Sequence, residues 1–180
     1  MPIAPETMTV SIRAAIKSDL PSIARIYAHA VLHGTASFEL EPPDENEMTR
    51  RYHALVDNNY PYLVAEDNAA LIGYAYAGPH RTRPAYNWTV EDSIYIAPEW
   101  QRRGIGGMLL SRLIAESERR NYRQMIAVIG DSNQIGSIKV HERHGFSLIG
   151  TYANVGFKFN RWLDSVLMQR TLGRGAETPP

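Results

Sequence analysis

The sequence predicts an α/β fold in one domain, with a single mixed, mostly antiparallel sheet and about four helices around it. At 180 residues the chain suits one domain, and no linker, repeat or low-complexity tract divides it. Apolar stretches of strand character alternate with segments of helical spacing, in the order β-α-α-β-β-β-α-β-α-β-β. The strand–helix–strand–helix run at the centre predicts parallel pairing there, and the hairpins on either side predict antiparallel pairing.

Each element follows from a local pattern. Strands are assigned where apolar and polar residues alternate, or where a short apolar run ends in turn residues. Helices are assigned where apolar residues recur every three to four positions. Ser18 or Asp19 would cap the first helix, and Gly34 and Gly145 would end the first and the last. Acidic residues open the second, as the helix dipole favours. The predicted strands are 9–15, 60–67, 69–79, 87–98, 124–130, 147–155 and 161–172, and the predicted helices are 18–34, 44–59, 105–120 and 131–146.

One junction has an unusual composition. In SIYIAPEWQRRGIGGMLL, residues 93–110, a strand and a proline turn lead into Gln101, Arg102 and Arg103 and then into glycines that open a helix. A helix start has unpaired N–H groups and partial positive charge, and glycine lets a ligand approach that backbone closely. The junction therefore predicts a pyrophosphate site. A tight turn with solvated arginines is the alternative, and the glycine spacing alone does not separate the two.

Two familiar nucleotide motifs do not fit this junction. No Lys-Ser/Thr pair follows the glycines, which excludes a P-loop. Gly104 and Gly106 lack the third glycine of the dinucleotide motif, because Leu109 stands at that position. A dinucleotide-binding fold stays a weaker alternative.

The QRRGIG run, placed after a strand and before a long helix, resembles the acetyl-coenzyme A signature of the GCN5-related N-acetyltransferase (GNAT) family. Its pattern is Gln/Arg-x-x-Gly-x-Gly/Ala. DSNQIGSIKVHERHGF, residues 131–146, is similar to the family's later motif, and the predicted element order matches that fold. In this fold the two central parallel strands splay apart. The resemblance covers about residues 9–172 and implies a single N-acetyltransferase domain over 1–180.

Four phrases narrow the resemblance. FELEPP, RTRPAYNWTVEDSIYI, HERHGF and VGFKFNRWLD are similar to the phosphinothricin and methionine sulfone/sulfoximine acetyltransferase branch. This implies an enzyme that transfers acetyl from acetyl-CoA to the α-amine of a small amino-acid analogue, by direct attack on the thioester. Two alternatives stay open. One is a GNAT enzyme for an aminoglycoside, a polyamine or a protein N-terminus, and the other is a non-catalytic acyl-CoA sensor. The sequence does not choose between phosphinothricin and the methionine derivatives.

The resemblance implies a cofactor site on two segments. Backbone N–H groups of 103–107 would hold the pyrophosphate, and strand residues 94–96 would pair with the amide-rich pantetheine arm. Asn133 would contact the cofactor, with Ser137 one turn later on the same side; an N-cap role for Asn133 is equally consistent. The expected cofactor-binding residues are Ile94, Tyr95, Ile96, Gln101, Arg102, Arg103, Gly104, Ile105, Gly106, Gly107, Asn133 and Ser137.

Two residues are expected to carry the proton transfers. Glu91 stands at the place of the branch's proposed general base, which must deprotonate the α-ammonium. A surface charge at a strand end is the plain alternative. Asp92 is the rival base, although alternation points it to the opposite sheet face unless a bulge intervenes. His141 stands where most family members have the Tyr that protonates the leaving thiolate. The reference pKa of His is about 6.5, against about 10 for Tyr. His141 could equally be a cation that the dipole of its helix favours near the C-terminus, so the identity of the general acid stays open.

The substrate's carboxylate needs a cation, preferably one with a fork of donors. Arg81 and Arg83 in the basic loop 80–86 are the candidates, with Tyr86 nearby. Phe38 and Glu39, in the loop 35–43, would form part of the pocket wall.

The composition argues against several other kinds of partner and site. The formal net charge of +0 argues against nucleic acid or an acidic membrane as a partner. No apolar run is long enough for a membrane span, the N-terminus does not resemble a signal peptide, and cysteine is absent, so we expect a cytoplasmic protein. His29 and His33 stand one turn apart without a carboxylate motif, so we expect no metal. Branch members commonly form homodimers, and the aromatics of NVGFKFNRW, expected between the last two strands, could serve that contact.

Overall fold

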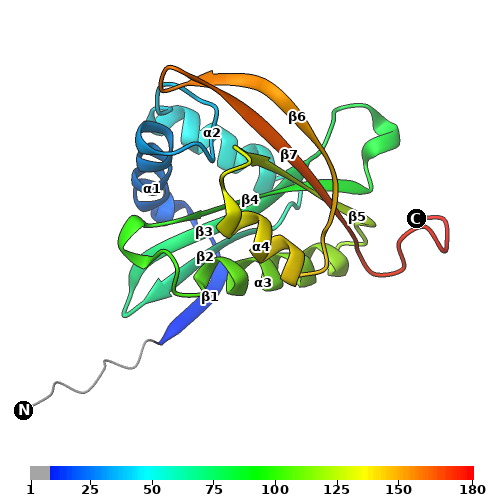
Figure 1. Cartoon of the computed structure of the whole chain (residues 1–180). Coiled ribbons are helices and arrows are strands. Elements are labelled where there is room, and N and C mark those ends of the chain that lie inside the picture. Colours follow the sequence, from blue (N-terminus) through cyan, green and yellow to red (C-terminus); the bar gives the residue numbers. More distant parts are fainter. Residues whose placement is uncertain (1–8) are drawn as a thin grey trace, which may run out of the picture.

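The computed structural model describes residues 9–180, and its elements follow the predicted order (Figure 1). Residues 1–8, which include most of the stretch compared with a signal peptide, lie outside the described residues. The strands are β1 (Val10–Ala14), β2 (Tyr62–Asp67), β3 (Ala70–Pro79), β4 (Thr89–Ile96), β5 (Gln124–Gly130), β6 (Ser147–Lys158) and β7 (Arg161–Thr171). The helices are α1 (Leu20–His33), α2 (Glu45–Val56), α3 (Ile105–Arg119) and α4 (Ile135–Arg143).

The described strands form one sheet in the order β1-β2-β3-β4-β5-β7-β6. All neighbouring pairs are antiparallel except β4 and β5, which are parallel. Their pairing ends at Asp92 and Ala127, although β4 continues to Ile96 and β5 to Gly130. The two strands therefore splay apart beyond Asp92, which confirms the predicted mixed sheet with a split parallel pair.

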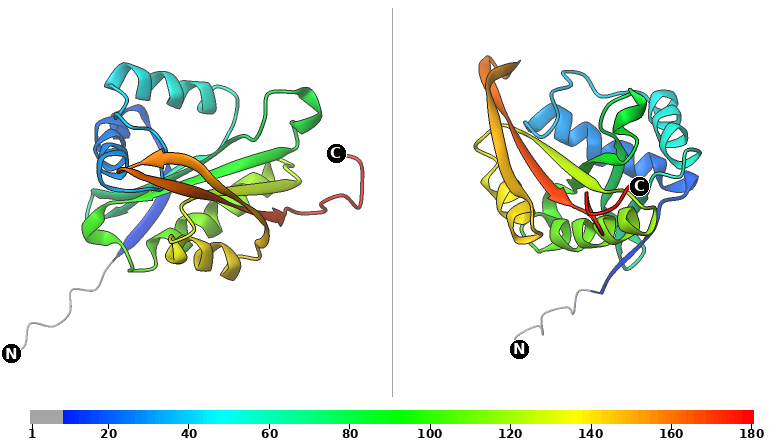
Figure 2. Two further views of the ribbon diagram at one scale, coloured as in Figure 1. Left: turned by 45° about the horizontal axis from the view of Figure 1, so that its top comes forward. Right: turned by 90° about the vertical axis from the view of Figure 1, so that its right-hand side faces the viewer.

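Helices cover both faces of the sheet (Figures 1 and 2). On one face, called here the α1–α2 face, Ile23 and Val31 of α1 pack against Tyr74 of β3. On the other, the α3–α4 face, Leu109 of α3 packs against Met125 of β5, and α4 lies beside α3. Each face thus has its own apolar core, and the splayed strands run between the two.

Helix ends follow the local sequence in most places. Asp44 caps α2, because its Oδ1 accepts the N–H of Glu47 at 2.8 Å. Gly145 follows α4 with φ of 81°, a left-handed conformation that favours glycine. Asp19 precedes α1 but makes no capping bond to it, because its carboxylate instead accepts from Arg13 at 2.7 Å.

The predicted start of the last helix was wrong. α4 begins at Ile135 rather than near 131, and its N-cap is Gln134 rather than Asn133. The reason is a turn before the helix, in which Asp131 Oδ1 accepts the Asn133 N–H at 3.0 Å. Local side-chain bonding of this kind competes with helix formation.

The predicted end of the sixth strand was also wrong. β6 continues past Val155 to Lys158, because its ladder with β7 resumes at Gly156 after an irregularity. Phe159 and Asn160 form the tight turn, with φ of 50° and 57°. The segment 154–162 therefore belongs to the β6–β7 hairpin instead of lying between two shorter strands.

Within residues 9–180, no helix has the length and apolar character needed to cross a membrane. The same residues contain no group of three or more His, Asp or Glu side chains arranged to hold a metal ion. His29 and His33 stack with their ring centres 4.7 Å apart.

Candidate active site

The loop between β4 and α3 turns at two left-handed residues. Arg102 has φ of 59° and Gly104 has φ of 85°, on either side of Arg103. Alternation of this kind turns successive N–H groups toward one side and forms an anion-binding concavity. α3 begins at Ile105, and its first N–H groups have no partners within the helix, so they extend the same set of donors.

The glycines of this junction have different surroundings. A Cβ added at Gly104 or Gly106 would meet no atom within 4 Å, so the space beside the helix end is open. A Cβ at Gly107 would lie 3.2 Å from Cε1 of His144, because α3 and α4 pack closely there. Gly104 and Gly106 therefore leave room for a ligand, whereas Gly107 serves the contact between the helices.

The side chains of the junction divide between surface and core. Arg103 lies over the ring of Trp100, 4.9 Å from its centroid, and remains exposed. Gln101 Nε2 donates to the Ile96 carbonyl at 3.4 Å. Ile105 is 1% exposed and belongs to the core, so only its backbone can serve a ligand.

β4 offers an unpaired backbone edge beyond Asp92. Residues 93–96 remain paired with β3, but their pairing with β5 has ended. Ile94 and Ile96 pack on the α3–α4 face, and Tyr95 lies on the other face against Tyr27, with ring centres 5.0 Å apart. An amide-rich chain entering the split can bind this edge as an added strand.

A small cleft of about 80 Å³ lies between the splayed strands. β4 and β5 supply residues 92–95 and 127–130, and α4 supplies Ser137 and His141. Ser137 is thus in the cleft as expected. Asn133 is exposed and does not line it.

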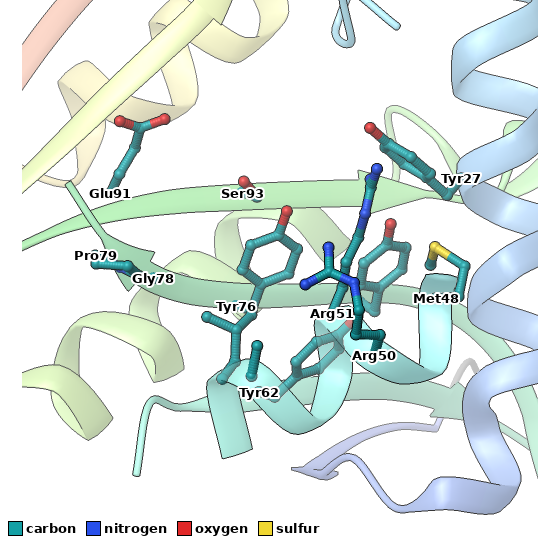
Figure 3. A pocket seen from close by; sticks show the side chains of 13 residues that line it. Tyr27, Met48, Arg50, Arg51, Tyr62, Tyr76, Gly78, Pro79, Glu91 and Ser93 are labelled. Carbon is teal, nitrogen blue, oxygen red and sulfur yellow. The ribbon is translucent and has the colours of Figure 1, made fainter. Parts of the chain in front are cut away.

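A larger cavity of about 300 Å³ opens on the α1–α2 face (Figure 3). Glu91 and Ser93 reach it from β4, beside the ring of Tyr76. Ser93 also lines the small cleft, so this one residue borders both cavities where β4 leaves β5. The full lining is Tyr27, Met48, Arg50, Arg51, Ala54, Leu55, Tyr62, Tyr74, Tyr76, Gly78, Pro79, Glu91 and Ser93.

Glu91 lines the larger cavity next to His80. Its Oε2 lies 3.2 Å from His80 Nδ1. Burial raises the pKa of Glu91, and the hydrogen bond with His80 opposes that rise. The register between β3 and β4 is regular at this point, so Asp92 points to the opposite face, as alternation predicted.

Asp92 and His141 form a buried pair on the α3–α4 face. His141 Nε2 lies 3.0 Å from Asp92 Oδ2, and His141 Nδ1 lies 2.8 Å from the Ser137 carbonyl. Burial lowers the pKa of His141, but Asp92 and the Ser137 carbonyl together hold that pKa above its ordinary value. Asp92 Oδ1 is buried without a hydrogen-bond partner among residues 9–180. An orphan acceptor of this kind fits a site that a donor on a bound molecule completes.

The loop 35–43 contributes to the cavity wall indirectly. Glu39 Oε1 accepts from the Tyr27 hydroxyl at 2.8 Å and from Arg51 at 2.7 Å, and both partners line the cavity. Glu39 does not line it. Phe38 does not either; its ring packs where a Cβ at Gly156 would lie, against the β6–β7 hairpin.

The expected carboxylate clamp lies outside the larger cavity. Arg81, Arg83 and Tyr86 stand on the exposed loop 80–86, where the Arg81 guanidinium lies 5.5 Å from the Tyr86 ring centre. None of the three lines the cavity, and the cations that do are Arg50 and Arg51 of α2.

Sequence reasoning missed Arg50, Arg51 and His80. Both arginines bind Glu47 at 2.7 Å, one turn earlier in α2, a spacing that is typical of a solvated helix face. His80 follows β3 directly, and its only signal is that β3 pairs with the strand that carries Glu91.

Comparison with known proteins places this geometry in a family. The family model described as acetyltransferase (GNAT) domain matches residues 12–167. The chain is 49% identical over 170 residues to a phosphinothricin N-acetyltransferase of Alcaligenes faecalis, covering 94% of this chain and 86% of that one. It is 40% identical over 167 residues to an L-methionine sulfoximine/L-methionine sulfone acetyltransferase of Salmonella typhimurium, covering 93% and 97%.

A solved structure agrees with these relatives. The crystal structure of a GNAT superfamily phosphinothricin acetyltransferase from Sinorhizobium meliloti, in complex with acetyl-CoA, is similar to this fold with a TM-score of 0.93. The identity is 48%, over 96% of this chain and 94% of that one. The residues that the family model matches, 12–167, include β4, the α3 junction and α4. The chain therefore belongs to the GNAT family of acetyltransferases.

Proposed function

We propose that this enzyme transfers the acetyl group of acetyl-CoA to the α-amine of a small amino-acid analogue such as phosphinothricin, methionine sulfone or methionine sulfoximine. The observation that carries the proposal is that Ser93 borders two cavities. One holds a carboxylate that can accept a proton, Glu91, and the other holds a histidine that can donate one, His141. Relatives named for these substrates support the substrate class.

Acetyl-CoA fits the α3 junction and the split sheet. The N–H groups of residues 103–107 would hold its diphosphate, with charge from Arg102 and Arg103. The space at Gly104 and Gly106 is open, and the exposed Gln101 precedes it in the same loop and would contact the cofactor. The free β4 edge at Ile94, Tyr95 and Ile96 would bind the pantetheine arm, with Ser137 and Asn133 near its α4 side. Bound there, acetyl-CoA supplies the thioester that the amine attacks.

Glu91 acts as the base in this proposal. It accepts the proton of the α-ammonium, directly or through one water, so that the free amine can attack. Burial raises the pKa of Glu91 and so makes it a stronger base than an exposed carboxylate, while the His80 contact opposes that rise. The cavity position of Glu91, beside Ser93, supports this role better than a surface charge.

His141 acts as the acid. It lines the small cleft on the opposite side of the sheet from Glu91, close to the strand edge proposed for the thioester arm. It gives a proton to sulfur as the thioester bond breaks. Acid and base therefore work from two faces of one strand.

The substrate's carboxylate and side chain would lie in the larger cavity. Arg81 and Arg83, with Tyr86, follow Pro79 of the cavity lining in sequence and would hold the carboxylate. Glu39 fixes the wall through Tyr27 and Arg51, and Phe38 seats the loop 35–43 against the hairpin.

We infer a cytoplasmic homodimer that does not bind nucleic acid. The absence of cysteine suits a reducing compartment, and the net charge of +0 gives no general attraction to nucleic acid. The β6–β7 hairpin exposes Phe157 and Trp162, which are 54% and 61% exposed with rings 5.2 Å apart. Exposed aromatics on one element favour a protein contact, here a second copy.

A thiol-release assay tests the function. Purified chain is mixed with acetyl-CoA and, in separate reactions, phosphinothricin, methionine sulfone, methionine sulfoximine, ordinary amino acids, a polyamine, an aminoglycoside and an N-terminal peptide. Release of free CoA with the amino-acid analogues, and mass-spectrometric detection of the N-acetyl product, is expected. Turnover only with one of the other amines would replace the substrate class. Binding of acetyl-CoA without turnover on any amine would indicate a sensor.

A further inference from the structure

The buried contact between Asp92 and His141 constrains where protons lie. His141 is 4% exposed and Asp92 is 7% exposed, and both ring nitrogens of His141 are engaged. Nδ1 faces the Ser137 carbonyl at 2.8 Å, and a carbonyl oxygen can only accept. Nδ1 therefore carries a hydrogen in either charge state of the ring.

The second nitrogen requires another proton. Nε2 faces Asp92 Oδ2 at 3.0 Å. If Nε2 had only a lone pair, an ionised carboxylate would repel it, and a buried polar group would lose its bond. A proton between Nε2 and Oδ2 removes the conflict, whether it resides on the ring or on the carboxyl. The pair thus holds one proton more than a neutral ring beside a carboxylate.

The pair also lies where the leaving group is proposed to be. Asp92 is the last residue of β4 paired with β5, and both Asp92 and His141 line the small cleft. Asp92 Oδ1 has no partner among the described residues although it is buried. A buried carboxylate oxygen without a donor is costly, which indicates that a donor on a bound molecule, an amide N–H or a thiol, completes this site.

The other charged groups near Asp92 and His141 lie on the opposite face of the sheet or at the surface. Glu91 precedes Asp92 in β4 but points to the α1–α2 face, where it pairs with His80. On α4 the Ser137 carbonyl faces the ring, and the remaining charged residues Lys139, Glu142 and Arg143 are exposed. From the loop after α4, the uncharged ring of Phe146 lies edge-on to His141 at 4.9 Å. Arg102 and Arg103, ahead of α3, are also exposed.

We propose that Asp92 is a positioning residue for His141: it fixes the ring at the vertex of the splayed strands and shares with it the proton that His141 gives to the leaving sulfur. The proposal rests on the proposed function, because it assigns a partner to that function's acid. It also removes Asp92 from competition with Glu91 as the base, since the two side chains lie on opposite faces.

The proton transfer balances as follows. When the carbon–sulfur bond breaks, its electron pair goes to sulfur, and sulfur takes the proton that Nε2 and Asp92 Oδ2 share, which forms the thiol. His141 is left as a neutral ring whose Nδ1–H still donates to the Ser137 carbonyl, and Asp92 is left as a carboxylate. Solvent then returns one proton to the pair. The amine, which begins as an ammonium, loses two protons; one balances the proton taken by sulfur, and the other is released.

Asp92→Asn is the decisive variant, because it keeps shape and hydrogen bonding. The new amide can donate to Nε2 of a neutral His141, so a role limited to packing would survive the change. Loss of the shared proton should instead lower kcat by about 100-fold at a pH of about 8. The high-pH limb of the kcat profile should move to lower pH, because a buried ring without an anion has a pKa at or below its usual value of about 6.5. Asp92→Glu, which restores the carboxylate, should recover part of kcat.

The matched control is Asp67→Asn. Asp67 is another buried carboxyl, on β2, and it accepts the Thr9 N–H at 2.9 Å. This variant should keep the wild-type kcat and pH profile. Thermal unfolding of both variants shows whether either has lost its fold.

A measurement that needs no turnover tests whether Asp92 and His141 share a proton. The ¹⁵N shifts of the His141 ring, assigned against His141→Gln, should stay constant from about pH 6 to pH 8 in the wild type and show a neutral ring in Asp92→Asn. A wild-type ring that titrates at about 6.5, or a folded Asp92→Asn with unchanged kcat and pH limb, would overturn the proposal. If the wild type releases no CoA with any amine, the proposed function fails, while the ¹⁵N titration still decides whether the proton is shared.

Discussion

Replacing Gly106 by alanine separates the folding role of the α3 start from its role in binding. Gly106 is the second residue of the helix, and a Cβ there would meet no atom within 4 Å. Glycine loses more backbone entropy than alanine on entering a helix, by about 1 kcal/mol. Gly106→Ala should therefore unfold about 2–4 °C above the wild type.

The same methyl group should weaken binding of acetyl-CoA. The diphosphate must come within hydrogen-bond distance of the first N–H groups of α3, and the methyl occupies the space beside them. Loss of one hydrogen bond to a charged group costs about 1.5–3 kcal/mol. That corresponds to a Kd raised by about 10-fold to 100-fold.

Calorimetric titration with acetyl-CoA and thermal unfolding without it measure the two effects. Gly150→Ala is the control, because a Cβ at this position on β6 also meets no atom within 4 Å. It should leave Kd unchanged and not lower Tm. Gly107→Ala should raise Tm less than Gly106→Ala does, because its Cβ would lie 3.2 Å from Cε1 of His144.

The outcome that refutes the reasoning is a stable Gly106→Ala with the Kd of the wild type. The backbone would then not be approached closely by the cofactor. A variant that unfolds at a lower temperature than the wild type would show that the space beside the helix is not open. Either result would remove the structural basis for placing the diphosphate at α3.

Four further predictions concern catalysis, recognition and assembly. Glu91→Gln should lower kcat by about 10²–10⁴-fold in the thiol-release assay, and an unaffected kcat would exclude Glu91 as the base. Because the base must be deprotonated and the His80 contact lowers the pKa of Glu91, His80→Leu should move the low-pH limb of kcat/KM to higher pH; an unmoved limb would show that the contact has no effect. Arg81→Ala should raise KM for amino acids more than for their amides, whereas Arg51→Ala, which also removes one of the partners of Glu39, should raise both alike. Equal effects of Arg81→Ala on acids and amides would contradict the clamp. Trp162→Lys should convert the proposed dimer to a monomer in light scattering at micromolar concentration, and a dimer that persists would place the interface elsewhere.

The sequence alone determined the order of the elements and the position of the α3 start. Periodicity separates strands from helices because it reports which face of each element is buried. The glycines after Arg103 indicate a helix start open to an anion because backbone N–H groups and dihedral freedom are local properties. Alternation along β4 also placed Glu91 and Asp92 on opposite faces, because the side-chain period of a regular strand is two.

Local rules failed where side chains compete with the backbone. The turn closed by Asp131 delays α4 and displaces Asn133 from the cap position. Whether such a bond forms depends on how the chain leaves β5, which the residues 131–134 do not specify by themselves. The longer β6 has a similar origin, since its last residues pair only because β7 continues beside them.

Only the tertiary structure decided which groups meet. The split between β4 and β5 arises from pairing that stops at Asp92 and Ala127, and Ser93, directly after it, borders both cavities. The contact of Asp92 with His141, 49 residues apart, requires α4 to pack on the sheet. Arg51 enters the larger cavity because α2 lies over β2 and β3, not because of its neighbours in sequence. Such contacts are set by the packing of whole elements, and a pattern read along one element carries no information about them.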